Sequence, residues 1–286
     1  MGDKAMHNVL AAIDASSYAE SVCRYAGWAS GRLGLPVELL HVVQRPDPVT
    51  ARRDLSGAIG LGVKGKLMDE LVRLSEESSR IDIERGRALL SAGETMLREA
   101  GAVNVVTLHR HGGIVETILE RETEARLVVI GKRGASQEFA SDHIGSKIER
   151  VVRASEKPVL VASRSFAEPR RIVFAYDAGP AAERALERLA NSPLFAGLPV
   201  TIVIADADAK REQLDRAVER IAPGRQVDAV LEAGKAEEVI PNLVSARESA
   251  LLLMGAYGHS PIRRMIVGST TSEMVRTVTA PVLLVR

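Results

Sequence analysis

The chain has 286 residues, of which 46% are hydrophobic and 26% are charged, and its 38 Lys and Arg balance 37 Asp and Glu. This composition is typical of a soluble globular protein with room for two domains, and the near-neutral charge argues against a dedicated nucleic-acid binder. The single cysteine, Cys23, excludes a disulfide within the chain, and no apolar run reaches the length of a membrane span. Because the first residues lack the apolar core of a signal peptide, we expect a cytoplasmic protein that binds neither membranes nor nucleic acids.

The two halves of the sequence resemble each other. The segment NVLAAIDAS, from Asn8, matches RIVFAYDAG, from Arg171, and the later segment ARLVVIGKRG, from Ala125, matches SALLLMGAYG, from Ser249. The spacing between matching residues agrees as well as the letters do. A repeat of this length indicates two copies of one domain, and we place them at residues 1–163 and 170–286.

Each copy alternates short runs rich in Val, Ile and Leu with amphipathic helical patterns. Such runs are typical of a parallel sheet that helices cover on both faces, so we expect two doubly wound α/β domains of five strands each, with a Rossmann-like fold. In the first copy the strands are expected at residues 9–14, 37–43, 103–108, 127–131 and 158–162. In the second copy they are expected at residues 172–177, 200–205, 227–232, 251–255 and 281–285.

The first copy carries a long helical insertion at residues 44–100, between its second and third strands. Residues 57–65 are rich in glycine and predict a mobile segment, whereas residues 66–100 predict one long charged amphipathic helix, broken near Gly86 or Gly93. This helix could simply pack on its own sheet. It could also act as a lid or as a surface that meets a protein partner.

The stretch GAYGHSPIRRMIVGS follows the fourth strand of the second copy and leads into a helix. Gly255 would let the chain turn away from the strand, and Gly258 would let the backbone approach a phosphate. Gly268, Ser269 and Thr270 open the helix, whose free N–H groups and positive end favour an anion, and the two hydroxyls can donate further hydrogen bonds. The loop therefore predicts a cradle for phosphate groups.

This loop matches the nucleotide-binding pattern of the universal stress protein family, G-x2-G-x9-G-[ST], and the resemblance extends over both copies. In that family the members that bind nucleotides hold ATP in this loop, and the other members do not. The resemblance implies that Asp177 contacts the adenine or ribose and that the backbone of Ala205 contacts the base. His259, beside Gly258, could touch a phosphate, although a solvated loop histidine is the simpler interpretation. We accordingly expect ATP with Mg²⁺ as the ligand.

The resemblance also implies a protein of the stress response whose relatives dimerise through the fifth strand. Here residues 157–162 and 280–286 could pair within one chain and so mimic a dimer of single domains, burying two exposed strand edges. Two such chains could pair further as a homodimer.

The first copy departs from the pattern, because GKRGASQEFASDHIGS has ten residues in its central gap. Arg133 and Lys147 bring positive charge to the place where phosphates would lie, whereas Glu138 and Asp142 count against a polyphosphate. Whether the first copy also binds nucleotide therefore stays open. Its positions that match the second copy are Asp14, Val42, Gly131, Gly134, Gly145 and Ser146.

Other interpretations of these residues carry less weight. Ser269 could be only an N-cap, and Asp177 could cap the helix that begins near Pro180. His109 and His111 alternate on one strand face, but no further cluster of Cys or His accompanies them, which weakens a zinc site.

Dedicated catalysis is not expected. The sequence holds no P-loop, no G-x-S-x-G motif and no evident general base, so any ATP hydrolysis would be slow. Two alternatives to a nucleotide-binding regulator remain open. One is a nucleotide-free scaffold that meets a protein partner through the helix at residues 66–100, and the other is a slow ATPase or adenylyl-transfer enzyme.

Overall fold

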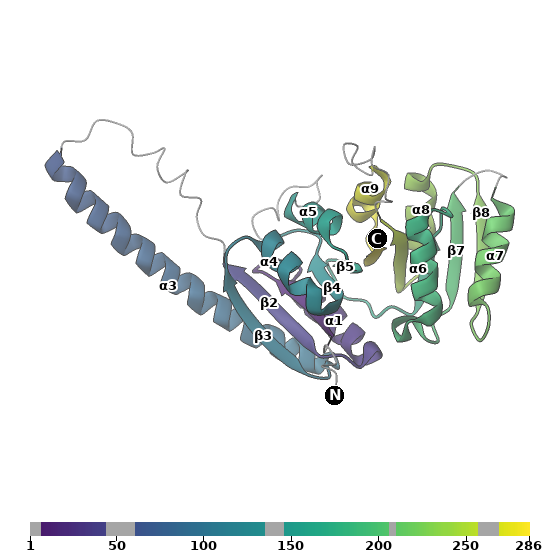
Figure 1. The fold of residues 1–286 in the computed structure, drawn as a ribbon, viewed down its shortest axis with the longest axis horizontal. Coiled ribbons are helices and arrows are strands. Elements are labelled where there is room, and N and C mark those ends of the chain that lie inside the picture. The colour runs from purple at the N-terminus through teal and green to yellow at the C-terminus, as the bar shows by residue number, and fades with distance from the viewer. Residues whose placement is uncertain (1–6, 44–60, 135–145, 206–209, 257–268) are drawn as a thin grey trace.

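The computed structural model describes residues 7–43, 61–134, 146–205, 210–256 and 269–286 (Figure 1). In these ranges one sheet of ten strands runs through both halves in the order β3-β2-β1-β4-β5-β10-β9-β6-β7-β8. The strands of the first half are β1 (Asn8–Ile13), β2 (Val37–Val43), β3 (Val105–His111), β4 (Ala125–Gly131) and β5 (Val159–Ala162). Those of the second half are β6 (Arg171–Ala175), β7 (Val200–Ala205), β8 (Val227–Glu232), β9 (Ala250–Gly255) and β10 (Val282–Val285).

Helices cover both faces of this sheet. One face carries the helices α1 (Ala19–Leu33), α3 (Leu61–Glu99), α6 (Pro180–Asn191) and α7 (Arg211–Ile221), with the 3-10 turn η3 (Pro193–Phe195). The other face carries α4 (Ile114–Arg121), α5 (Ser146–Ala154), α8 (Ala236–Ser245) and α9 (Ser269–Thr277); the 3-10 turn η1 (Glu122–Glu124) follows α4. Burial on both faces explains why the inner strands are continuous apolar runs, and the two-sided cover of the sheet confirms the expected α/β class.

The two halves join through their fifth strands. All strand pairs within each half are parallel, but β5 and β10 pair antiparallel, with Leu160 opposite Leu283. Every residue of both strands is buried. The expected pairing of these segments within one chain is confirmed. Because a single sheet runs through both halves, the division into domains at residues 163 and 170 stays a prediction from the repeat.

The long helix α3 is one continuous element, so the expected break near Gly86 or Gly93 is wrong. A Cβ atom at Gly86 would lie 2.6 Å from Nε2 of His109, and one at Gly93 would lie 2.8 Å from Cδ2 of Leu39. The two glycines therefore let α3 press closely onto β2 and β3 instead of interrupting it. Residues 61–65, expected to be mobile, belong to the helix, and residues 57–60 lie outside the described ranges.

Only the second part of α3 packs on the sheet. Leu90 and Leu97 are buried in the core, whereas the helix projects away from the body of the molecule towards its first residues (Figure 1). Every described side chain between residues 70 and 80 is exposed, including that of Leu74, which is 51% exposed. Packing on the sheet thus accounts for one part of the insertion. The role of the other part as a partner surface stays a prediction.

The segment that joins β5 to β6 packs against α1. The hydroxyl of Tyr25 lies 2.8 Å from Oγ of Ser163, and the Tyr25 ring meets the Phe166 ring edge to face, with the centroids 4.8 Å apart. In the part of the chain that the structure describes, no helix is both long and apolar enough to cross a membrane.

Candidate functional site

In each half, the described strand-end residues of the cradle lie where the strand order reverses. β1 lies between β2 and β4, and β6 lies between β7 and β9. The connection from β1 to β2 and that from β4 to β5 therefore run in opposite directions along the sheet, as do those from β6 to β7 and from β9 to β10. Ligands of doubly wound sheets bind at such points, outside the carboxyl ends of the strands. Asp14 follows β1 and Gly131 ends β4, while Asp177 follows β6 and Gly255 ends β9.

In the first half, the described residues that follow β4 lie close to Asp14. Its Oδ1 accepts a hydrogen bond from the backbone N–H of Ser16 at 3.1 Å, and a Cβ atom at Gly134 would lie 2.9 Å from its Oδ2. A Cβ atom at Gly131 would lie 2.7 Å from Cβ of Tyr18, at the start of α1. Close approach therefore requires a glycine at 131, whereas at 134 the Asp14 side chain could move aside. The structure brings Asp14, Gly131 and Gly134 together as expected.

A small cleft lies beside these three residues. Its volume is about 60 Å³, and Asp14, Arg133 and Gly134 line it together with apolar side chains such as Ile118 and Ile148. Small-molecule sites usually enclose about 300–1,000 Å³, so this cleft alone does not hold a nucleotide. Lys147 is the second residue of α5. Val42, which was expected near the base, does not line the cleft but is buried in the core beneath α4 and α5.

In the second half, Gly255 is required by a close approach. It is the last residue of β9, and its φ angle is not in the left-handed region, so the expected turn of the chain at this glycine stays a prediction. A Cβ atom there would lie 2.6 Å from the backbone nitrogen of Ala182. Gly255 therefore lets the end of β9 lie against the first turn of α6, as Gly131 does with α1.

Asp177 shapes the turn that leads from β6 into α6. Its Oδ1 accepts a hydrogen bond from the backbone N–H of Gly179 at 2.8 Å, and Gly179 itself is the N-cap of α6. Asp177 is therefore not the helix cap that the sequence allowed as an alternative. Its side chain is exposed at the carboxyl edge of the sheet, near Ala205, the last residue of the neighbouring strand β7.

A carboxylate that sequence reasoning missed lies at the start of α9. The hydroxyl of Thr270 donates a hydrogen bond to Oε1 of Glu237, in the first turn of α8, at 2.7 Å. This hydrogen bond is the main reason why the pKa of Glu237 lies below its usual range. The contact joins residues far apart in the sequence, so no local pattern indicated it.

Several predicted site residues lie outside the described ranges. These are Gly258, His259, Gly268 and Gly145. The backbones of Ser269 and Ser146 open α9 and α5, as the pattern requires of a strand-loop-helix cradle.

The two histidines that were weighed as zinc ligands have a third beside them. His41 on β2 stacks on His109 with the ring centroids 5.4 Å apart, and His109 stacks on His111 at 5.7 Å. Burial, followed by the nearby His41, His111 and Arg87, lowers the pKa of His109. Over the described residues, no group of three His, Cys, Asp or Glu has the arrangement to hold a metal ion.

Comparisons of the sequence and of the fold with known proteins both point to one protein family. The model of the universal stress protein family matches residues 6–163 and 200–286. Universal stress protein Slr1230 of Synechocystis is 32% identical over 293 residues, which cover 98% of this chain and 100% of that protein. A universal stress protein from Archaeoglobus fulgidus, 21% identical, shares the fold at a TM-score of 0.69 over 98% of this chain and 96% of that one. Two others, solved in complex with cAMP and with dAMP, reach TM-scores of only 0.35, too low to say what this chain binds.

Proposed function

Because the chain belongs to the universal stress protein family, we propose that it is a regulatory protein of the stress response that binds ATP with Mg²⁺ in the loop between β9 and α9. The main support is the placement of the family pattern: Gly255 ends β9 at the reversal of strand order, and α9 begins at Ser269. The free N–H groups and the positive end of a helix that starts here favour phosphate oxygens.

The surrounding side chains fit this ligand. Thr270 has a hydroxyl in the first turn of α9, and Glu237 offers a carboxylate beside it. Since the hydrogen bond from Thr270 lowers the pKa of Glu237, this carboxylate is ionised at neutral pH. Mg²⁺ in nucleotide sites is usually held by one or two carboxylates together with the phosphates. Glu237 is therefore the residue that we assign to the metal ion, and Asp177 and the backbone of Ala205 are those that we assign to the nucleoside.

A nucleotide-free scaffold is the second candidate, and α3 is the observation that favours it. Its described side chains between residues 70 and 80 lie exposed, and the apolar side chains of Leu74 and Ile81 are 51% and 43% exposed. A protein partner could cover such a helix.

The deciding experiment is to purify the chain without added nucleotide, denature it and identify any released small molecule by mass spectrometry. Gly258→Glu and Gly134→Glu serve as each other's control, because each places bulk and negative charge in one of the two loops. We expect ATP to be released by the unchanged protein and by Gly134→Glu, and to be lost from Gly258→Glu. Loss from Gly134→Glu alone would move the site to the first half. If nothing is released and titration with ATP and Mg²⁺ shows no binding, the scaffold is the better account.

A further inference from the structure

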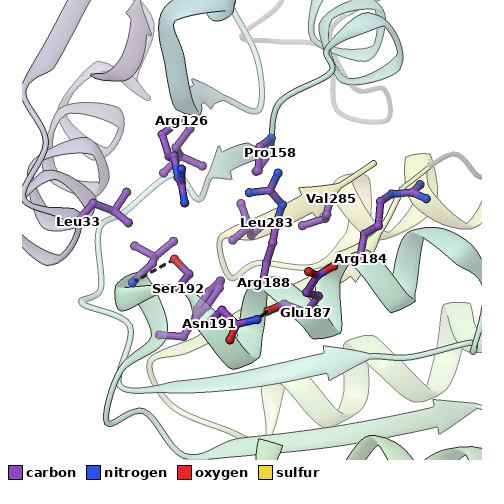
Figure 2. A pocket seen from close by; sticks show the side chains of 13 residues that line it. Leu33, Arg126, Pro158, Arg184, Glu187, Arg188, Asn191, Ser192, Leu283 and Val285 are labelled. Carbon is purple, nitrogen blue, oxygen red and sulfur yellow. Dashed lines mark hydrogen bonds between the residues drawn. The ribbon is translucent and has the colours of Figure 1, made fainter. Parts of the chain in front are cut away.

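A second hollow lies where the two halves meet, away from both cradles. It encloses about 320 Å³ over β4 and β10, between the end of α1 and the side of α6 (Figure 2). Leu127, Leu283 and Val285 of the sheet and Leu194 and Phe195 of η3 supply apolar side chains to it. None of the residues assigned to the cradles lines it. The volume is at the lower end of the range of small-molecule sites.

Three guanidinium groups also line this hollow, and they come from both halves. Arg126 belongs to β4, whereas Arg184 and Arg188 lie one turn apart on α6, and Figure 2 shows Arg126 and Arg188 on opposite sides of the hollow. Nε of Arg184 donates to the backbone oxygen of Arg286 at 2.7 Å, but its Nη2 is buried without a hydrogen-bond partner.

The electrostatics of the hollow favour an anion. Within the described residues, neither Arg126 nor Arg188 has a hydrogen bond or an ion pair to another side chain. Burial lowers the pKa of Arg188, and the like charge of Arg126 lowers it further, while the neighbouring Glu187 acts in the opposite direction. Glu187 is the one carboxylate on the lining, so three positive charges face a single negative one.

The internal repeat shows that this hollow is not a necessary gap between two packed copies. Counted from Asp14 and Asp177, Arg188 occupies the position that Tyr25 occupies in the first half. There the Tyr25 ring packs against Phe166 of the connecting segment, and its hydroxyl meets Ser163, so the corresponding place is filled by the chain itself. In the second half the place is open, and an arginine replaces the tyrosine.

We propose that this hollow, which we call the arginine pocket, binds a small organic anion with a carboxylate or phosphate group on an apolar body. The head group would lie between Arg126 and Arg188, and the body would lie on Leu127, Leu283 and Val285. Guanidinium groups bind both kinds of head group in a two-pronged manner. Because the arginines that would contact the anion come from both halves, a bound anion would hold the two halves together.

Isothermal titration with four probes tests this assignment: decanoate, octyl phosphate, neutral decanol and inorganic phosphate. We expect decanoate or octyl phosphate to bind at least about tenfold more tightly than decanol or inorganic phosphate, because charge-assisted hydrogen bonds and apolar burial act together. Whichever of these two anions binds more tightly shows whether the pocket prefers a carboxylate or a phosphate head group. Equal binding of decanoate and decanol, or no binding of either anion, would overturn the proposal.

Three variants separate the pocket from other effects. Arg126→Met and Arg188→Met keep an apolar stem and remove a charge, and each should weaken binding of the anion about tenfold. Arg211→Met, which removes an exposed arginine on α7, is the matched control and should bind as the unchanged protein does. Arg188→Tyr, which introduces the residue of the first half, should close the pocket. If the double variant Arg126→Met and Arg188→Met binds the anion within twofold of the unchanged protein, the pocket is not its site.

Discussion

The described parts of the two cradles share one arrangement, a strand end beside a helix start, and differ in the charged side chains around it. In the first half, Arg133 lines the cleft and Lys147 is the second residue of its helix. In the second half, Thr270 takes the position of Lys147 and is bonded to the carboxylate of Glu237. Spacing within the family pattern favours the second loop, whereas among the described side chains the positive charge is greater beside the first. The difference teaches that a repeated backbone fixes where a ligand can lie, while the side chains around it decide which ligand and whether a metal ion accompanies it.

The largest effect is expected where the halves differ inside the sheet. Arg121 donates to both carboxylate oxygens of the buried Glu38, at 2.8 and 2.6 Å, and the second half has Thr201 in place of Glu38. Arg121→Met should lower the free energy of unfolding by roughly 3 kcal/mol, because it leaves a buried carboxylate unpaired. Urea denaturation, followed by the fluorescence of Trp28, the chain's one tryptophan, measures it.

The matched control for this change is the double variant Arg121→Met and Glu38→Thr, which copies the residue of the second half. It should recover most of the loss, since no charge is left buried. If the double variant is as unstable as the single one, the side chain of Arg121 stabilises the protein by packing and not by its charge.

The next effect compares two glycines that both belong to the family pattern but occupy different positions in it. Gly255→Ala should cost about 2 kcal/mol, because the new Cβ would meet the backbone of α6, which cannot move aside. Gly134→Ala should cost less than about 1 kcal/mol, since its Cβ would meet only a carboxylate oxygen of Asp14. Thermal and urea denaturation of the two variants compare them directly. Equal costs would contradict the role assigned to Gly255.

A third change tests whether the acidic side chain of the second cradle serves a metal ion. Glu237→Gln should weaken ATP binding in Mg²⁺ about tenfold and strengthen it slightly in EDTA, where the carboxylate only repels phosphate. Calorimetric titrations under both conditions measure this, and Glu238→Gln is the control on the same turn. The same loss of affinity with and without Mg²⁺ would show that Glu237 supports the loop and holds no metal ion.

The smallest effect is a pH dependence confined to the first half. The pKa of His109 is lowered from its usual 6.5 in the folded protein, so the unfolded chain takes up a proton first as the pH falls. Stability should therefore decrease from just above pH 6.5 downwards, as a charge on His109 would face His41, His111 and Arg87, with Glu94 on the same groove. His109→Gln should reduce the fall in the urea midpoint between pH 7.5 and pH 5. An unchanged fall would assign the pH dependence to other groups.

The sequence was sufficient to predict the strands but not the contacts between distant segments. Each of the ten expected strands overlaps an observed one. The inner strands were recognisable because apolar runs buried on both faces can be identified without knowing their neighbours. The pairing of β5 with β10 was also foreseen, since two exposed edges favour covering each other.

The errors arose where a distant contact decides the structure. Gly86 and Gly93 were interpreted as breaks in a helix because glycine has a weak helix propensity. In the structure the helix is continuous, and the two glycines allow it to pack closely on β2 and β3. Glu237 and His41 were missed for the same reason, because their partners lie on other elements. The arginine pocket is visible only once α6 is placed beside β4.

The antiparallel contact of β5 with β10 has a consequence for the relative amounts of the two halves in the cell. Two separate domains that pair only by encounter come apart on dilution. Here the join is covalent as well as hydrogen-bonded, so the effective concentration of one half near the other does not depend on how much protein the cell contains. The two cradles are therefore always present in a one-to-one stoichiometry, and each can diverge in sequence without losing its counterpart to a competing copy.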